Sequence, residues 1–325
     1  MKIKNKLLLL LAIFTLIIPA NVLALVDQVI LGGENIGIEI DTEGVLIVGF
    51  YTINNNTNTK NLKLGDRIIK INNNKVNNIN EMIKEIESSI SKKDINLTII
   101  RNNEEIETTL KLEYENNTYK TGIYVKDKII GIGSIAYINP ETKTYGALGH
   151  EIIESYSNTK VEVKTGKIYD STVTGIKKSS KTKTGEKQAK INKDISYGNI
   201  DKNTITGIYG TYTGTLNMDN LISVAKKNEI HEGKAYIYTV LENNKKEKYE
   251  INIIKINQTS KTKNILFEIT DQKLINKTNG IIKGMSGSPI IQNNKIIGAV
   301  THAIQSKNNL GYGIFITTML EEGEN

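Results

Sequence analysis

The residues best suited to chemistry lie in the hexapeptide at 284–289, whose sequence is Gly-Met-Ser-Gly-Ser-Pro. It places Ser286 between two glycines and shortly before an apolar run. Because glycine has no side chain, the backbone N–H groups beside it can approach a reacting carbonyl group. The same pattern is typical of a turn that leads into a β-hairpin. The hexapeptide therefore suggests a serine nucleophile with its own oxyanion hole, a hypothesis that needs support from other residues.

A serine hydroxyl needs a neighbouring base, and histidine is the usual one because its pKa lies near neutrality. The chain has only three histidines. His150 follows the small-residue stretch Tyr-Gly-Ala-Leu-Gly, after two strand patterns joined by a turn, which favours it as the base. His231 lies in a polar turn and is expected at the surface. His302, on the strand after the serine, is either a pocket residue or an ordinary strand histidine.

A carboxylate that orients the imidazole would complete a catalytic triad. Five aspartates lie between His150 and Ser286, at positions 170, 194, 201, 219 and 271. Asp201 has an ordinary separation from the histidine for a chymotrypsin-type order. Asp271 ends an apolar strand pattern only 15 residues before the serine. Spacing alone leaves the choice between Asp201 and Asp271 open.

A metalloprotease is the rival chemistry, because the sequence from His150 to Glu154 begins like the zinc motif HExxH. Its fifth position is glutamate, so the second histidine of that motif is missing. The chain also has no cysteine, which excludes thiolate nucleophiles, disulfides and cysteine zinc sites. We therefore expect neither a metal nor a cofactor.

The bulk composition is that of a globular protein of one large or two ordinary domains. The 325 residues carry a net charge of +7, mostly from lysine, with 6% aromatic residues and no tryptophan. Since no basic run is interleaved with aromatic residues, nucleic-acid binding is not expected. The polar, lysine-rich stretch 177–190 is predicted to be a solvated loop.

The N-terminus has the pattern of an export segment. Three lysines precede an apolar stretch from Leu7 to Ile18, and Val-Leu-Ala at 22–24 is a plausible cleavage site. We predict that residues 1–26 form a signal peptide or a membrane anchor, and the pattern leaves both open.

Residues 27–115 read as a small α/β module of alternating strand patterns and one amphipathic helix near 79–89. The run Leu-Gly-Asp-Arg-Ile-Ile-Lys-Ile-Asn-Asn at 64–73 resembles the signature of bacterial PDZ domains. That resemblance implies that Ile36, Gly37 and Ile38 form the loop that receives a peptide terminus, beside a strand edge that takes an extended peptide. Packing against the next domain is the alternative role.

Residues 116–325 read as mainly β, with short apolar runs separated by Gly, Asn, Ser and Lys, and a helix only at the end. Such a length of short strands suits one barrel or a pair of barrels. A histidine from one barrel facing a serine from a second is the chymotrypsin-like arrangement.

Several motifs together resemble the SpoIVB peptidase family, sporulation serine peptidases with a PDZ domain ahead of the catalytic domain. They are Tyr-Gly-Ala-Leu-Gly-His at 145–150, Ile-Thr-Asp at 269–271, Gly-Met-Ser-Gly-Ser-Pro-Ile-Ile-Gln-Asn at 284–293 and Gly-Ala-Val-Thr-His at 298–302. The resemblance implies that Ser286 is the nucleophile, His150 the base and Asp271 the orienting acid. Similarity to chymotrypsin-like serines implies an oxyanion hole formed by the N–H groups of Gly284 and Ser286. The short Asp–Ser separation departs from ordinary chymotrypsin-like spacing.

The family also implies a role. Such peptidases are exported across the forespore membrane into the space between two membranes. There they cleave a membrane-bound regulator, which releases an intramembrane metalloprotease that processes a sigma factor, and they process their own N-terminal region. Two other functions remain open: a non-catalytic PDZ and barrel scaffold that binds a membrane partner, and an HtrA-like quality-control protease. The PDZ module usually follows the protease domain in the latter, whereas here it comes first.

Overall fold

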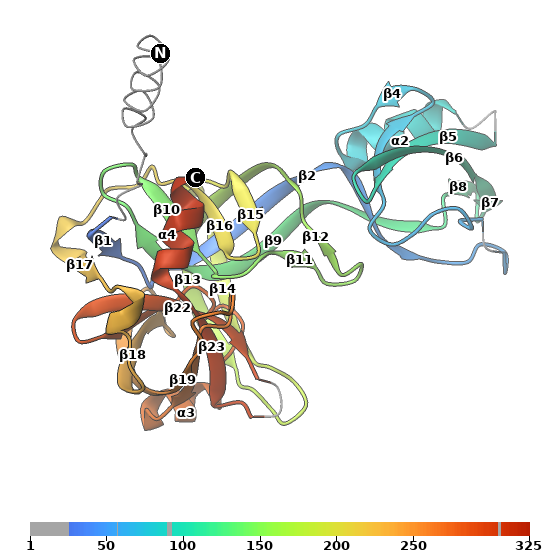
Figure 1. Cartoon of the computed structure of the whole chain (residues 1–325). Coiled ribbons are helices and arrows are strands. Elements are labelled where there is room, and N and C mark those ends of the chain that lie inside the picture. Colours follow the sequence, from blue (N-terminus) through green and yellow to red (C-terminus); the bar gives the residue numbers. More distant parts are fainter. Residues whose placement is uncertain (1–25, 57, 90–92, 305–306) are drawn as a thin grey trace, which may run out of the picture.

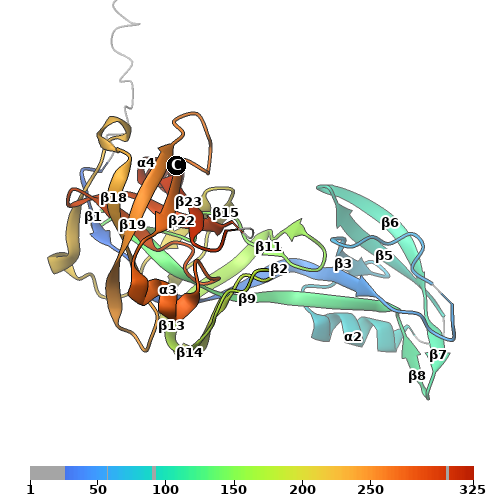
Figure 2. The same ribbon diagram turned by 90° about the horizontal axis from the view of Figure 1, so that it is seen from below.

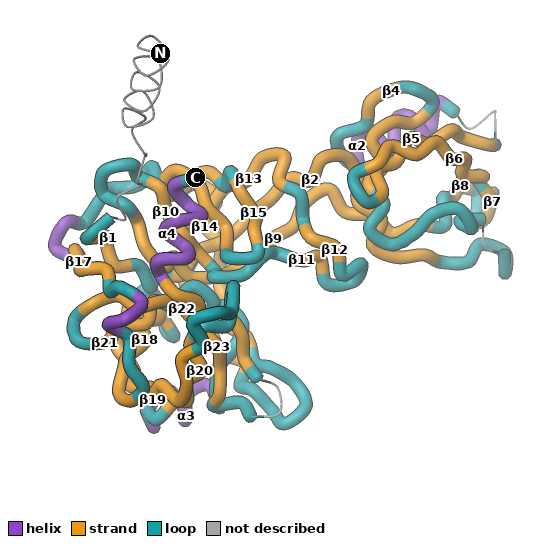
Figure 3. Tube along the Cα trace, viewed as in Figure 1, coloured by secondary structure: helices purple, strands orange, loops and turns teal. Residues whose placement is uncertain are grey.

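The computed structural model describes residues 26–56, 58–89, 93–304 and 307–325. The chain is built mainly from β-strands, which form two adjoining barrels and a smaller module that projects from them (Figure 1). Helices are few and short (Figure 3). The predicted export segment falls on residues 1–26, nearly all of which lie outside the described residues. Within the described ranges, no helix is long and apolar enough to cross a membrane.

The second barrel holds the C-terminal part of the chain and is closed by six strands. Around the barrel, these are β18 (Gly233–Val240), β19 (Lys246–Ile256), β20 (Ile265–Ile269), β23 (Leu310–Phe315), β22 (Lys295–Ala303) and β21 (Pro289–Gln292), which pairs back to β18. Its interior is filled by aliphatic and aromatic side chains, including Phe267, Met285 and Phe315. Closure leaves no free sheet edge in this barrel.

The first barrel is built from six antiparallel strands between residues 35 and 211, four of which are 14 to 16 residues long. Its neighbours in order are β2 (Asn35–Phe50), β9 (Ile123–Ile138), β10 (Thr144–Ala147), β16 (Gly207–Thr211), β14 (Glu186–Asn199) and β13 (Val163–Lys177), which pairs back to β2. A bridge between Gly198 and Tyr212 joins β14 to the end of β16. The barrel core includes Ile36, Ile38 and Leu148.

The remaining short strands outside the module are β1 (Gln28–Leu31), β11 (Ile153–Glu154), β12 (Thr159–Lys160), β15 (Lys202–Thr204) and β17 (Leu221–Val224). Strands β1 and β17 link the two barrels, because they pair with each other, β1 also pairs with β9, and β17 also pairs with β22. Helix α3 (Gln272–Thr278) follows β20, α4 (Ile316–Glu324) ends the chain, and the 3-10 turns span Met218–Asn220 and Lys227–Glu229. Helix α4 packs its buried Ile316, Met319 and Leu320 against a cluster between the barrels.

The projecting module is inserted into the first barrel. It consists of the second half of β2, then β3 (Arg67–Ile71), β4 (Asn74–Lys75), α2 (Ile79–Ser88), β5 (Asp94–Arg101), β6 (Glu104–Lys111), β7 (Glu113–Glu115), β8 (Thr118–Lys120) and the start of β9. Strands β2 and β9 run continuously from this module into the barrel and pair along most of their lengths (Figure 2). The module has its own core, which includes Ile47, Ile68 and Met82.

Asparagine pairs shape the tight hairpins of the module and of the second barrel. Asn72–Asn73, Asn102–Asn103 and Asn293–Asn294 all have positive φ angles at both positions. A two-residue turn of this handedness matches the twist of the strands it joins, and asparagine adopts it more readily than most residues. These hairpins therefore form for a local reason.

The strand pairing differs from two sequence-based expectations about the module. The predicted boundaries, 27–115 and 116–325, assign residues 28–41 to the PDZ module, but β1 and the first half of β2 belong to the barrel sheets. Ile36, Gly37 and Ile38 therefore do not form a peptide-receiving loop. They pair with β9 on one edge and with β13 on the other, so their backbone groups are occupied by neighbouring strands.

Candidate active site

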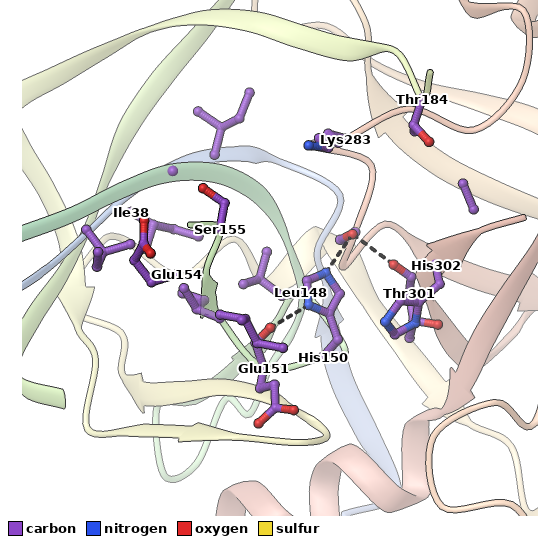
Figure 4. Close-up of a pocket in the computed structure, with 18 of the residues that line it drawn as sticks. Ile38, Leu148, His150, Glu151, Glu154, Ser155, Thr184, Lys283, Thr301 and His302 are labelled. Carbon is purple, nitrogen blue, oxygen red and sulfur yellow. Dashed lines mark hydrogen bonds between the residues drawn. The ribbon is translucent and has the colours of Figure 1, made fainter. Parts of the chain in front are cut away.

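The structure brings Ser286 and His150 together across the two barrels. Ser286 lies on the loop before β21, and His150 follows β10 of the first barrel. Nε2 of His150 is 3.0 Å from Oγ of Ser286, although the two residues are 136 positions apart in sequence. Figure 4 shows the imidazole of His150 at this contact. The distance is that of a nucleophile and its general base.

A backbone carbonyl orients the histidine. Nδ1 of His150 lies 2.8 Å from the carbonyl oxygen of Glu151, as the dashed line in Figure 4 marks. Since a carbonyl oxygen only accepts hydrogen bonds, Nδ1 carries the proton and Nε2 keeps its lone pair. Burial lowers the pKa of His150 below its usual 6.5, which also favours the neutral ring. The imidazole is therefore in the form that can remove the Ser286 proton.

Asp271 and Asp201, the two carboxylates that the sequence left open, do not reach this histidine. Oδ1 of Asp271 accepts the N–H groups of Lys273 and Leu274 at the start of α3, and its Oδ2 accepts the N–H of Glu250. Such an N-terminal cap satisfies N–H groups that a helix leaves unpaired. Asp201 accepts from the side chain of Asn199. In this structure Asp271 therefore does not orient His150, contrary to the role that the family resemblance implies.

The Ser286 loop presents two unused backbone donors. The N–H groups of Met285, Gly287 and Ser288 donate to the carbonyl oxygens of Ile282, Val300 and Met285. The N–H groups of Gly284 and Ser286, which the sequence assigned to an oxyanion hole, have no partner among the residues that the structure describes. Both are consequently free to donate to a substrate oxygen.

Ser134 of β9 fixes this loop from the opposite barrel. Its hydroxyl donates to the carbonyl oxygen of Gly284 at 3.1 Å, and its N–H donates to that of Ser286 at 2.9 Å. Gly287 has a φ of +89°, and a Cβ placed there would lie 1.9 Å from the carbonyl oxygen of Ser134. Only glycine satisfies both the conformation and the close approach.

The two other histidines have different surroundings. His302 lies on β22 with its ring centroid 5.0 Å from that of His150, and it lines the same cavity. Burial, followed by repulsion from Lys263 and from His150 whenever that ring is protonated, lowers the pKa of His302 to about 4 and keeps it neutral. His231 is exposed, as expected, and its N–H donates to Gln292.

A cavity of about 1160 Å³ surrounds the Ser–His pair. One wall is β9 from Lys128 to Ile132, and another is the segment from His150 to Ser155. The opposite side consists of residues 261–263, 281–284 and 301–303. Figure 4 shows Leu148, Thr301 and Lys283 around this space. The cavity is large enough for several residues of a peptide.

Comparison with protein families agrees with this geometry. Residues 117–320 match the family described as SpoIVB peptidase S55. The chain belongs to the SpoIVB peptidase S55 family. It is accordingly a serine peptidase, and the residues matched include His150, Asp271 and Ser286. Residues 35–112 match the PDZ domain family, a match that begins at the first residue of β2. Comparison with curated proteins gives no match.

Sequence reasoning did not find three functional contacts of this SpoIVB-type peptidase. Glu151 acts through its main chain, which no side-chain motif can signal. Thr301 accepts a hydrogen bond from the Ser286 hydroxyl through its carbonyl oxygen, at 3.0 Å. Ser134 lies in a Gly-Ile-Gly-Ser run that reads as an ordinary strand. The solvated loop predicted at 177–190 is confined to residues 178–185, because β13 ends at Lys177, β14 begins at Glu186 and Lys187 is buried.

Proposed function

We propose that this peptidase cuts internal peptide bonds by acyl transfer, with Ser286 as nucleophile and His150 as base. The observation that carries the assignment is the 3.0 Å contact between Nε2 of His150 and Oγ of Ser286, inside a peptide-sized cavity. His150 removes the hydroxyl proton during attack and returns it to the leaving amine. The N–H groups of Gly284 and Ser286 stabilise the tetrahedral oxyanion, and water then hydrolyses the acyl-enzyme.

The His–Ser pair works here with the carbonyl oxygen of Glu151 behind the imidazole. This oxygen selects the tautomer, as an aspartate does in a triad. It carries only a partial charge, so it stabilises the imidazolium less than a carboxylate would. The proposal accordingly gives Asp271 a structural role in capping α3.

The biological setting we propose follows from the family. The peptidase is exported across the forespore membrane to the space between the two membranes, anchored by its N-terminal segment or released from it. There it cleaves a membrane-bound regulator of an intramembrane metalloprotease and thereby triggers sigma-factor processing. It also processes its own N-terminal region. Family membership and the lysine-flanked apolar segment at residues 2–18 support this setting.

Self-cleavage offers a direct test. Wild-type and Ser286→Ala proteins are incubated, and the N-termini of all fragments are sequenced. We expect discrete fragments from the wild type and none from the variant, together with fluorophosphonate labelling of the wild type alone. Undiminished fragmentation of Ser286→Ala would refute the nucleophile, and an unlabelled wild type that still binds a partner would favour the scaffold function.

A further inference from the structure

Lys187 is a buried cation that the reaction described above does not use. It lies at the start of β14 and is only 3% exposed. Its N–H donates to the carbonyl oxygen of Lys283 at 3.0 Å, directly before the nucleophile loop. Its methylene carbons lie 3.0–3.2 Å from the point where Gly284 would carry a Cβ. The side chain of Lys187 therefore packs against the backbone of an oxyanion-hole residue.

The amine of Lys187 ends in a buried polar network that joins the two barrels. Nζ contacts Oγ1 of Thr239 at 3.1 Å and Oδ1 of Asn35 at 3.4 Å. The hydroxyl of Ser288 donates to the same Thr239 oxygen at 2.9 Å, and the amide of Asn35 donates to Ser171. Lys187 thus holds the nucleophile loop at two points, through Gly284 at one end and through Thr239 and Ser288 at the other.

No carboxylate in the described parts of the chain forms an ion pair with this amine. The ionisable residues adjacent to its contacts on each packed element are Glu34, Asp170, Glu186, Tyr238 and Lys283. Glu34 and Glu186 pair with other lysines, and Asp170 accepts from Tyr197. Burial alone lowers the pKa of Lys187 to about 7.

A contribution to fold stability does not explain why a lysine is buried at position 187. An uncompensated buried amine is costly, and an apolar side chain of similar shape usually serves a core at least as well. Costly ionisable groups beside a reaction centre are candidates for a functional role. The geometry of the loop indicates what that role is, because the two free donors, Gly284 and Ser286, lie within the segment that Lys187 holds.

We propose that Lys187 is a positioning residue for the peptidase reaction. It keeps residues 284–288 in the conformation that directs the N–H groups of Gly284 and Ser286 at the substrate oxygen. Its ammonium group also places a positive charge behind the loop when the oxyanion forms. This inference rests on the proposed role of Ser286.

The first test measures the rate of fluorophosphonate labelling of full-length protein across pH 5–9. Lys187→Met is compared with wild type and with Lys190→Met, a control on the exposed side of the same strand. We expect a loss of at least tenfold for Lys187→Met, no loss for the control and no drop in melting temperature. The wild-type rate should also decline as pH rises above about 7 while that of Lys187→Met does not. Equal rates and identical pH profiles would overturn the proposal.

A second test does not depend on the folding of the methionine variant. Because the chain has no cysteine, Lys187→Cys can be alkylated at a single thiol while unfolded and then refolded. Bromoethylamine restores a lysine-like amine there, whereas bromopropane gives a side chain of the same length without it. Recovery of labelling only with the amine supports the proposal, and equal labelling of both forms refutes it. Wild-type protein carried through the same unfolding and refolding controls for recovery of the native fold. Native, untreated wild type that fails to label would instead count against Ser286 as nucleophile.

Discussion

The family resemblance assigns catalytic roles to both Ser286 and Asp271, but the structure places the two residues in different surroundings. The Ser286 loop is held by the other barrel, through two hydrogen bonds from Ser134 and the contact with His150. Asp271 is engaged locally, by N–H groups two and three residues ahead and by Glu250 of the adjacent strand. The comparison teaches that a carboxylate near a nucleophile in sequence is not thereby available to its base.

The largest effect is expected from removing the base. His150→Gln keeps a side chain of similar size but cannot take the Ser286 proton. We expect peptide cleavage to fall by at least about 10³-fold, because nucleophile and base act as a unit. Measured kcat/KM with an unchanged circular dichroism spectrum checks this. A loss below tenfold would show that the contact between the barrels is not catalytic.

Replacing Gly287 within the Ser286 loop should lower activity nearly as much. Gly287→Ala places a methyl group against the Ser134 carbonyl oxygen at a φ of +89°. Strain and overpacking together should destabilise the fold by roughly 2–5 kcal/mol and displace the oxyanion donors. Urea unfolding and labelling rates measure the two effects separately. Wild-type values for both would mean that the loop tolerates a shift away from Ser134.

The pH dependence tests the environment of the histidine. Since the pKa of His150 is lowered by burial, the reactive neutral form should persist below the usual 6.5. The labelling rate should rise with pH through a midpoint below 6.5. A midpoint above 6.5 would point to a carboxylate facing the imidazole, because a negative charge there raises the histidine pKa.

The smallest effect on activity is expected from substitutions of Asp271. They distinguish most clearly between a structural role for this residue and a catalytic one. As a helix cap, Asp271→Asn should keep activity and lose only a little stability, since its amide oxygen still caps α3 but its NH2 group cannot accept the N–H of Glu250. Asp271→Ala should lose about 1 kcal/mol of stability. As an orienting acid, Asp271→Asn would instead lower activity by about 10⁴-fold. Cleavage assays and thermal unfolding of both variants distinguish the roles. A large loss for the asparagine variant would restore Asp271 to the triad.

Much of the fold and of the catalytic pair could be predicted from local patterns. The β-hairpin that follows the Ser286 loop turns at Asn293–Asn294, and such a turn is predictable because its backbone preference is local. Ser286 and His150 could be selected because few residue types perform nucleophilic catalysis and the chain has only three histidines. The PDZ signature likewise identified the module, but not its insertion between β2 and β9, which depends on pairing with distant strands.

The sequence by itself determined the peptidase family, the mainly β architecture and the identity of the Ser–His pair, because these depend on residue types in order along the chain. Only the tertiary structure decided which hydrogen-bond partners and neighbours each residue has. The strand pairing excludes the peptide-binding role predicted for Ile36, Gly37 and Ile38, because β9 and β13 pair with both edges of their strand. The amine of Lys187 is buried because two strands that are distant in sequence, β2 and β18, meet at it. Each hydrogen-bond donor or acceptor can bond to only one or two partners. The partner that it meets in the folded protein depends on tertiary packing, which a local sequence pattern does not contain.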